Sequence, residues 1–330
     1  MQKCEWYVLI VKACMKLTIW LLFAVLVFYC CRSPQTFTIN IVEEKLFDSI
    51  PSGSGVVYHQ KQLLIISDDA PFIYKMSLKD FLYEAIPLKG YASDVYRISK
   101  TSKPDFECAT TGNIEDKEYL FAFGSGSKSP ARDSMLMTDV DDLKQQHIIS
   151  LGEFYSSLQQ QLKLGKKEWN IEGALTYNGS LVLLNRGNNA VVTIAWKEFI
   201  KFIQDGTLPK ASHYVLQLPQ YRGHTARLSG ACKLDDNGNV LFCASIEDTP
   251  NWYTDGPVLG SFIGIFNIAE KKVKHIAMLQ RDSKAILDKI ESVEVIEAAG
   301  NTAQVVACAD NDRGHTKIYL LKIKWCYPAG

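Results

Sequence analysis

The sequence predicts an all-β fold, and three observations lead to this prediction. Short apolar runs of strand length recur along the chain, with turns rich in Gly, Asn and Asp between them. Asn178-Gly179 forms a two-residue hairpin signal between the expected strands 171–177 and 181–184. A third strand, expected over 190–196, follows a looser turn. The middle run Leu-Val-Leu-Leu does not alternate, so both of its faces should be buried and this small sheet needs neighbours.

Similar units elsewhere in the chain are expected to supply the neighbouring sheets. The first strand of each copy carries a polar residue at a matching position, and these residues are Ser54, Glu107, Glu172, Ser229 and Glu294. A second apolar strand, a third strand and a fourth apolar run follow in the first four copies. Five units of this kind in phase predict a β-propeller with five blades of four strands, and six blades are the alternative.

The two ends of the chain should close the ring. The last copy stops after its third strand, at 319–325, and the segment 37–42 precedes the first copy as an additional strand. We expect this N-terminal strand to complete the last blade, because an incomplete sheet would leave an unpaired edge.

The first 34 residues are expected to be a leader, followed by a single domain over 35–330. Residues 17–31 form an apolar run after Lys12 and Lys16 that is short for a bilayer span but suits a signal-peptide core. Its end at Cys30-Cys31 resembles a lipobox, where a cysteine is lipidated after cleavage. A lipoprotein, an ordinary secretion signal and an uncleaved anchor remain open. Each predicts export, to the periplasm or cell envelope, with membrane attachment only through this anchor.

The composition of the chain narrows the kinds of partner that the protein can bind. Lys and Arg number 36, as do Asp and Glu, which argues against a nucleic-acid binder because such proteins carry a basic excess. Five of the nine cysteines lie beyond the leader and are interpreted as buried core thiols, since no Cys-x-x-Cys spacing occurs. We expect a monomer that binds a small molecule or a glycan.

One face of the predicted propeller carries the long loops. Residues 124–134 and 247–260 join second strands to third strands, and the insertion 153–168, which has a helical pattern, enters a first strand. Hairpins on the opposite face are short, as at Asn178-Gly179. The face with the long loops is therefore predicted to be the binding face.

Carboxylates should converge at this mouth. Glu107, Glu172 and Glu294 begin their blades, and three unpaired carboxylates at low dielectric would be too costly, so partners must exist. Three interpretations stay open. In the first, nearby cations in or beside the same loops neutralise the glutamates in a structural network, and these are Arg132, Arg186, Arg227 and Lys103. In the second, Glu107, Glu172, Glu294 and Asp310 bind Ca²⁺ through oxygen ligands. In the third, Glu172 and Glu107 act as acid and base, with Arg132 at the substrate. The expected ligand-binding residues are Arg186, Asn188, Glu247 and Trp252.

The start of the third blade, Ile171-Glu172-Gly173-Ala174, resembles the esterase-like or phytase-like propeller domains of exported bacterial proteins. Asp-Phe-Glu at 105–107, Leu-Asn-Arg-Gly-Asn at 184–188 and Ala-Asp-Asn-Asp-Arg-Gly at 309–314 extend this similarity over most of residues 37–325. The resemblance implies a propeller and a bound divalent cation. Lactonase-type propellers hold calcium with Glu, Asn and Asp, and Glu172, Asn188 and Asp310 are of those types.

These observations lead to two functional hypotheses. The favoured one is an exported propeller that binds a small ligand in its axial mouth, with metal-assisted hydrolysis of an ester or phosphoester. There the glutamates would hold the cation, and Arg132 or Arg186 would bind the anionic group of the substrate. The alternative is a non-catalytic scaffold that binds a glycan or a protein.

Overall fold

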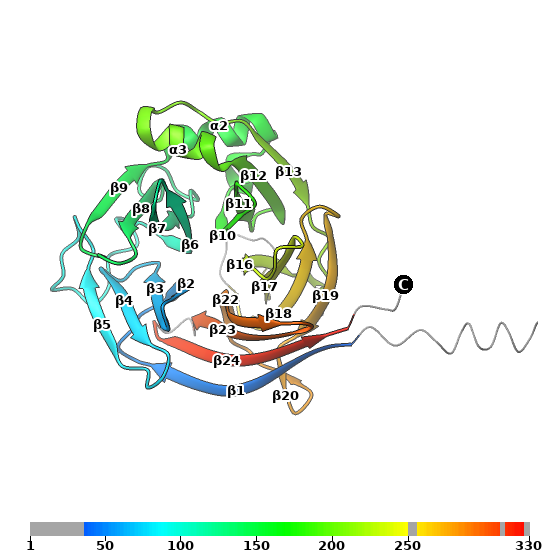
Figure 1. Ribbon diagram of the computed structural model, residues 1–330. Coiled ribbons are helices and arrows are strands. Elements are labelled where there is room, and N and C mark those ends of the chain that lie inside the picture. The colour runs from blue at the N-terminus through cyan, green and yellow to red at the C-terminus, as the bar shows by residue number, and fades with distance from the viewer. Residues whose placement is uncertain (1–35, 250–255, 311–313, 327–330) are drawn as a thin grey trace, which may run out of the picture. The chain divides into compact units, whose positions relative to one another are not determined.

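The computed structural model describes residues 36–249, 256–310 and 314–326. Residues 38–324 form one compact unit, in which five four-stranded sheets surround a central axis (Figure 1). The fold is a five-bladed β-propeller, which confirms the repeat and the blade count expected from it. The leader over 1–34, its Cys30-Cys31 pair and Trp252 lie outside the described residues.

The strands of each blade follow one another from the axis outward (Figure 1). Blade 1 contains β2 (Gly53–His59), β3 (Gln62–Ser67), β4 (Phe72–Ser77) and β5 (Tyr83–Pro87). Blade 2 contains β6 (Phe106–Ile114), β7 (Lys117–Gly124), β8 (Ser134–Asp139) and β9 (Gln146–Ser150). Blade 3 contains β10 (Ile171–Tyr177), β11 (Ser180–Asn185), β12 (Ala190–Ala195) and β13 (Ala211–Val215). Blade 4 contains β16 (Arg227–Lys233), β17 (Asn239–Glu247), β18 (Val258–Asn267) and β19 (Lys272–Met278).

Blade 5 joins the two ends of the chain. Its sheet order is β22 (Lys289–Ala299), β23 (Thr302–Asp310), β24 (Thr316–Trp325) and β1 (Phe37–Phe47). The N-terminal strand is therefore the outer strand of the last blade, as the sequence predicted. This pairing completes the fifth sheet and removes the edge that β24 would otherwise expose.

The hydrophobic core lies between neighbouring blades. Val57 and Ile66 of blade 1 pack in one cluster with Leu120 and Ala122 of blade 2. Corresponding clusters join blades 2 and 3, blades 3 and 4, and blades 5 and 1. The β11 residues Leu181 to Leu184 are all buried, as expected from a strand that is covered on both faces.

Two helices cover the outside of blades 2 and 3. The predicted helical insertion is confirmed as α2 (Gly152–Leu162), followed by the 3₁₀ helix η1 (Lys166–Glu168). The second helix, α3 (Trp196–Asp205), was not expected, because the third strand of blade 3 was predicted to continue through Trp196. That strand ends at Ala195, and α3 buries Phe199 and Phe202 at helical spacing against Phe154 of α2.

Two small hairpins precede blades 4 and 5, and they were not expected either. They are β14 (Gln220–Tyr221) with β15 (His224–Thr225), and β20 (Gln280–Arg281) with β21 (Lys284–Ala285). Within the described part of the chain, no helix has the length and apolar character that a membrane crossing requires.

Every innermost strand contains a β-bulge at the same place. The pairing with the second strand shifts between Gly53 and Gly55 in β2, and at the corresponding positions of the other four blades. A bulge adds one residue to one strand and redirects its side chain. The five bulge residues are Ser54, Glu107, Glu172, Ser229 and Glu291.

The bulge in blade 5 corrects one sequence prediction. Glu294 was matched to Glu107 and Glu172, but it pairs with Val306 three residues beyond the bulge. The equivalent residue is Glu291, which lies between Ile290 and Ser292. The mismatch arose because β22 is longer than the other inner strands and carries two irregularities, so the apolar pattern Val-Glu-Val-Ile was aligned out of register.

Candidate functional site

A cavity of about 810 Å³ opens at the face that carries the long loops. Its lining comes from the first-strand bulges, from the loops that enter first strands and from the loops that join second strands to third strands. The described residues around it are Ser52, Ser54, Asp68, Asp69, Arg97, Lys100, Lys103, Asp105, Glu107, Ser127, Lys128, Arg132, Asn170, Glu172, Arg186, Glu247, Gly256, Pro257, Lys289, Glu291, Asp310 and Gly314. All of these side chains are polar or charged except those of the two glycines and Pro257.

Three glutamates form the acidic floor of this cavity, a name used below for Glu107, Glu172 and Glu291. Each is the bulge residue of its blade, so the same backbone irregularity turns all three side chains toward the axis. Blades 1 and 4 place serines there instead. Ser54 also lines the cavity, whereas Ser229 is fully buried and donates a hydrogen bond of 2.6 Å to the carbonyl of Ile290.

Arg186 neutralises one side of the floor. Its guanidinium donates hydrogen bonds to Glu172 at 3.2 Å, to Glu247 at 3.1 Å and to the hydroxyl of Ser245 at 2.8 Å. Asn170 donates a further hydrogen bond of 2.6 Å to Glu172. Because the Arg186 side chain is only 3% exposed, its charge is compensated within the protein and little of it reaches the cavity.

A second ion-pair group involves Lys289. Its ammonium lies 2.9 Å from a carboxylate oxygen of Glu291 and 3.5 Å from one of Glu247. Glu247 is thus shared between Lys289 and Arg186, and the two groups form one network across blades 3, 4 and 5. Of the three glutamates for which the sequence required partners, Glu172 is paired in this network.

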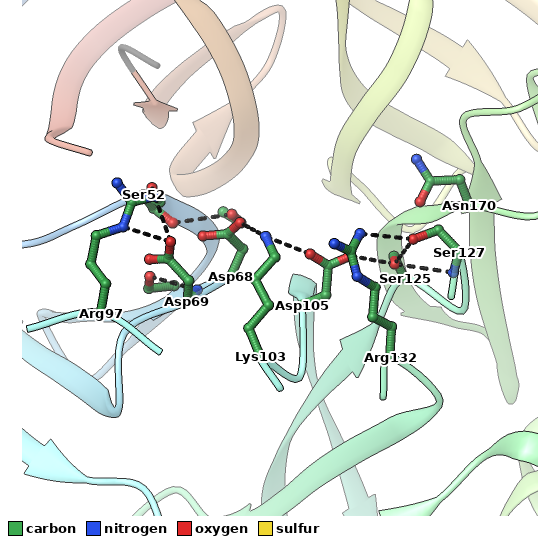
Figure 2. Close-up of polar contacts among 12 residues, drawn as sticks. Ser52, Asp68, Asp69, Arg97, Lys103, Asp105, Ser125, Ser127, Arg132 and Asn170 are labelled. Atoms are coloured by element: carbon green, nitrogen blue, oxygen red, sulfur yellow. Dashed lines mark hydrogen bonds and ion pairs between the residues drawn. The ribbon is translucent and has the colours of Figure 1, made fainter. Parts of the chain in front are cut away.

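Lys103 forms the third group (Figure 2). Its buried ammonium contacts Asp68 and lies 2.6 Å from Asp105. Asp105 also accepts a hydrogen bond of 2.8 Å from Arg132, whose guanidinium donates another of 3.0 Å to Ser127 (Figure 2). Asp105 therefore lies between two cations that come from two different loops.

Arg97 anchors the long connection between blades 1 and 2 beside this group. Its guanidinium donates a hydrogen bond of 2.7 Å to Asp69 and another of 3.2 Å to Ser52 (Figure 2). The Asp69 side chain is 6% exposed, and that of Arg97 is 44% exposed, so this pair lies with its carboxylate inward and its arginine toward the solvent.

Burial raises the pKa of several carboxyl groups in the cavity. It raises the pKa of Asp68 to about 7, against the lowering effect of Lys103. It raises the pKa of Glu291 to about 8, against that of Lys289. The pKa of Glu107 is also raised well above its ordinary value, first by burial and then by the nearby charges of Asp105 and Asp68. These groups retain protons at a pH where exposed carboxyls are ionised.

Two lysines at the cavity have no ion pair with any residue that the structure describes. Lys100 and Lys128 are both exposed, and both line the cavity from loops. Lys128 lies next to Arg132, because its carbonyl accepts a hydrogen bond of 3.0 Å from the Arg132 amide. We call Lys100, Lys128 and Arg132 the basic rim.

The structure brings most of the expected site residues to one place. Those that line the cavity are Glu107, Glu172, Arg132, Arg186, Glu247 and Asp310. Asn188 is not among the lining residues, and its side-chain oxygen accepts hydrogen bonds from Asn185 and from the amide of Ala190. Glu294 is not among them either, and burial raises its pKa to about 8.

The expected Ca²⁺ ligands do not form one cluster. Among the described residues, the group of acidic side chains whose oxygens lie within 4.8 Å of one another consists of Asp68, Asp105 and Glu107. Of the four expected ligands, only Glu107 belongs to it. Glu172 is held by Arg186 and Asn170, and Glu294 lies beyond the bulge.

Several residues of this site were not predicted from the sequence. Glu291 could have been found, because Ile290-Glu291-Ser292 repeats the pattern of an apolar residue, a glutamate and a small residue. Lys103 was expected among the neutralising cations, but Arg97 and Lys289 were not. Arg97 lies in the connection between blades 1 and 2 and Lys289 at the start of β22, and no local pattern marks either as a partner of the carboxylates.

The fold and this site define a five-bladed β-propeller with a charged axial cavity. Residues 49–323 match the Family of unknown function (DUF6929), and the chain belongs to this family. No curated protein shows significant sequence similarity to it.

Several solved structures are similar to this chain. A glutaminyl cyclase of Myxococcus xanthus is 11% identical with a TM-score of 0.47, over 89% of this chain and 100% of that one. The PQQ-bound aldose sugar dehydrogenase of Streptomyces coelicolor is 11% identical with a TM-score of 0.48, over 88% and 99%. An exported protein of Bacteroides fragilis is 10% identical with a TM-score of 0.39, over 87% and 95%.

Proposed function

We propose that the axial cavity binds a small, strongly polar ligand and holds an anionic group of that ligand at the basic rim. The observation that carries this proposal is the lining itself. Among its described residues, it contains no aromatic side chain and one apolar ring, that of Pro257. Such a surface offers little to an apolar ligand, because its charged groups would lose water without gaining partners.

The basic rim is the part of the lining that can bind an anion. Lys100 and Lys128 are exposed cations with no ion pair to described residues, and the Arg132 side chain is 22% exposed. The alternative anchor, Arg186, already has three acceptors within the protein. We therefore place the anionic group at Lys128 and Arg132 rather than at Arg186.

Binding can be tested with simple anions. Inorganic phosphate and ethyl phosphate should raise the melting temperature of the purified protein in a concentration-dependent manner. The effect should weaken in Lys128→Ala and remain in Lys79→Ala, which removes an exposed lysine in the turn after β4 that does not line the cavity. Equal stabilisation of both variants would mean that the anion binds elsewhere.

Hydrolysis of an ester or phosphoester is a second candidate function. It is favoured by carboxyl groups that retain protons near neutral pH, since Asp68 has a pKa of about 7 and Glu291 a pKa of about 8. Glu172 suits this role less, because Arg186 and Asn170 hold its carboxylate. A panel of esters and phosphoesters should show turnover that falls at least tenfold in Glu291→Gln. If the wild type shows no turnover above this variant, the cavity is a binding site alone, as in the non-catalytic alternative.

The residues present do not suit a Ca²⁺ ion well. Calcium takes six to eight oxygen ligands, and the group of Asp68, Asp105 and Glu107 supplies three carboxyls. The ammonium of Lys103 contacts two of them, and Arg132 contacts Asp105. Even with all three carboxyls ionised, these two cations leave one surplus negative charge, which is less than a divalent ion would compensate. Unchanged melting temperatures in CaCl₂ and in EDTA would agree with this charge balance.

Export remains part of the proposal and depends on the apolar run 17–31. Fractionation of cells that express the full chain should place the protein in the envelope fraction. Replacement of both Cys30 and Cys31 by serine should release it from the membrane if a lipid anchor holds it there. Recovery of the wild-type protein in the cytoplasm would contradict export.

A further inference from the structure

The charges that line the cavity are not evenly distributed. Eight of its described side chains are carboxyls and seven are cations, and two of these cations are the exposed Lys100 and Lys128. The remaining cations contact carboxylates of the lining, in the pairs and groups described above. The interior of the cavity therefore has more carboxyls than cations, and its entrance has the unpaired positive charge.

Glu107 is the carboxyl in the acidic floor that this network does not reach. Glu172 is paired with Arg186, and Glu291 is paired with Lys289. Glu107 forms no hydrogen bond and no ion pair with the residues that the structure describes, although it lines the cavity. Its oxygens lie within 4.8 Å of those of Asp68 and Asp105, whose charges are shared with Lys103 and Arg132. With all three carboxyls ionised, one negative charge would be left over in this group.

We propose that the ligand is a zwitterion, with a monocationic group such as an ammonium at Glu107 and its anionic group at Lys128 and Arg132. This inference rests on the proposed binding function and names the class of ligand for the same cavity. A single positive charge balances the surplus carboxyl, whereas a purely anionic ligand would leave Glu107 without a partner. An ammonium supplies three donors to a carboxyl that has none from the protein.

The raised pKa of Glu107 supports this placement. Without a ligand, the Glu107 carboxyl retains a proton, because burial and neighbouring carboxylates disfavour its charged form more than the charge of Lys103 favours it. A ligand ammonium beside it favours the ionised form, so binding should release a proton from Glu107. Release from Glu107 is not expected with a ligand that lacks the amino group, whose only proton source is its own phosphate.

The probes are ω-aminoalkyl phosphates and alkyl phosphates of equal chain length, beginning with 2-aminoethyl phosphate and ethyl phosphate. Isothermal titration at pH 7 should show that, at the best chain length, the amino probe binds about tenfold tighter than its matched alkyl phosphate. In Glu107→Gln this advantage should fall below about threefold, while the affinity for the alkyl phosphate changes little. In Lys128→Ala both probes should bind more weakly.

Two controls separate this effect from general damage. Glu294→Gln alters another carboxyl of raised pKa on an innermost strand that does not line the cavity, so it should preserve the advantage of the amino probe. Should Glu107→Gln fold poorly, titration of the wild type in buffers of different ionisation enthalpy still measures the proton release. The amino probe should release more protons than the alkyl phosphate, whose own phosphate has a second pKa of about 6 and loses only a small fraction of a proton at pH 7.

The outcomes distinguish the two proposals. Alkyl phosphates that bind through Lys128 with no gain from the amino group would overturn the zwitterion and leave the anion site intact. A gain that persists in Glu107→Gln would also overturn it. If neither series binds, or if binding does not depend on Lys128, the proposed function fails together with this inference.

Discussion

Arg186 and Glu172 form a hydrogen-bonded ion pair of 3.2 Å in which the arginine side chain is 3% exposed and that of the glutamate 7%. Solvent reaches little of either side chain, so each charge depends on its partners within the protein. Removal of one partner from a buried pair costs much more than the pair contributes as a whole.

Arg186→Met should therefore lower the free energy of unfolding by about 3–5 kcal/mol, because Glu172 and Glu247 would both lose a donor. Urea denaturation monitored by fluorescence measures the change. Arg222→Met is a suitable control, because Arg222 is exposed in a hairpin turn and its loss should cost less than about 0.5 kcal/mol. A loss below about 1 kcal/mol for Arg186→Met would show that water or ions compensate the glutamates.

Lys103→Met should destabilise the protein in a pH-dependent manner. The substitution leaves Asp68 without its ammonium partner and Asp105 with Arg132 alone. The expected loss at pH 8 is about 3 kcal/mol, and it should be smaller at pH 5, where protonation removes the charge of Asp68. Lys100→Met, in the same loop, removes a cation without an ion pair to described residues and should be nearly neutral. An equal loss at both pH values would contradict the assignment of the effect to charge.

Glu294 gives a separate pH prediction. Burial raises its pKa from 4.5 to about 8 in the folded protein, so the folded state binds a proton that the unfolded state has already released. The stability from this proton is fully present below pH 4.5 and is lost as the pH rises to about 8.

The wild type should thus lose on the order of 2 kcal/mol more stability than Glu294→Gln between pH 5 and pH 8. Denaturation curves of both proteins at these two pH values test the difference. Glu297→Gln changes an exposed glutamate on the same strand and should follow the wild type. Parallel curves for the wild type and Glu294→Gln would mean that Glu294 is ionised throughout this range.

Gly187→Ala should disturb the loop that carries Arg186. A Cβ atom at position 187 would lie 2.0 Å from the backbone oxygen of Glu168, so one of the two chain segments must move. We expect a loss of at least about 2 kcal/mol. Gly152→Ala is the matched control, because the nearest atoms to its Cβ are 3.8 Å away or more. A Gly187→Ala protein as stable as this control would show that the loop adapts easily.

The sequence predicted the propeller because every blade repeats the same order of buried strands and turns, and the core depends on that order. The convergence of Glu107 and Glu172 could also be predicted, since repeated positions in a ring face a common axis. Glu291 was missed because a second bulge lengthens β22 and shifts its pattern. Arg97 and Lys289 were missed for a different reason. Their roles depend on which loops meet at the cavity, and loop geometry is not encoded by local periodicity.

The sheet that contains both β1 (Phe37–Phe47) and β24 (Thr316–Trp325) has a consequence for biosynthesis. β1 is synthesised first, and it can pair with β24 only after almost the whole chain has been synthesised. Contacts so distant in sequence form slowly, because the intervening chain loses entropy when they close. Until then, the nascent protein exposes the unpaired edge of this sheet, which chaperones must shield. Early truncation would leave the ring of blades permanently incomplete.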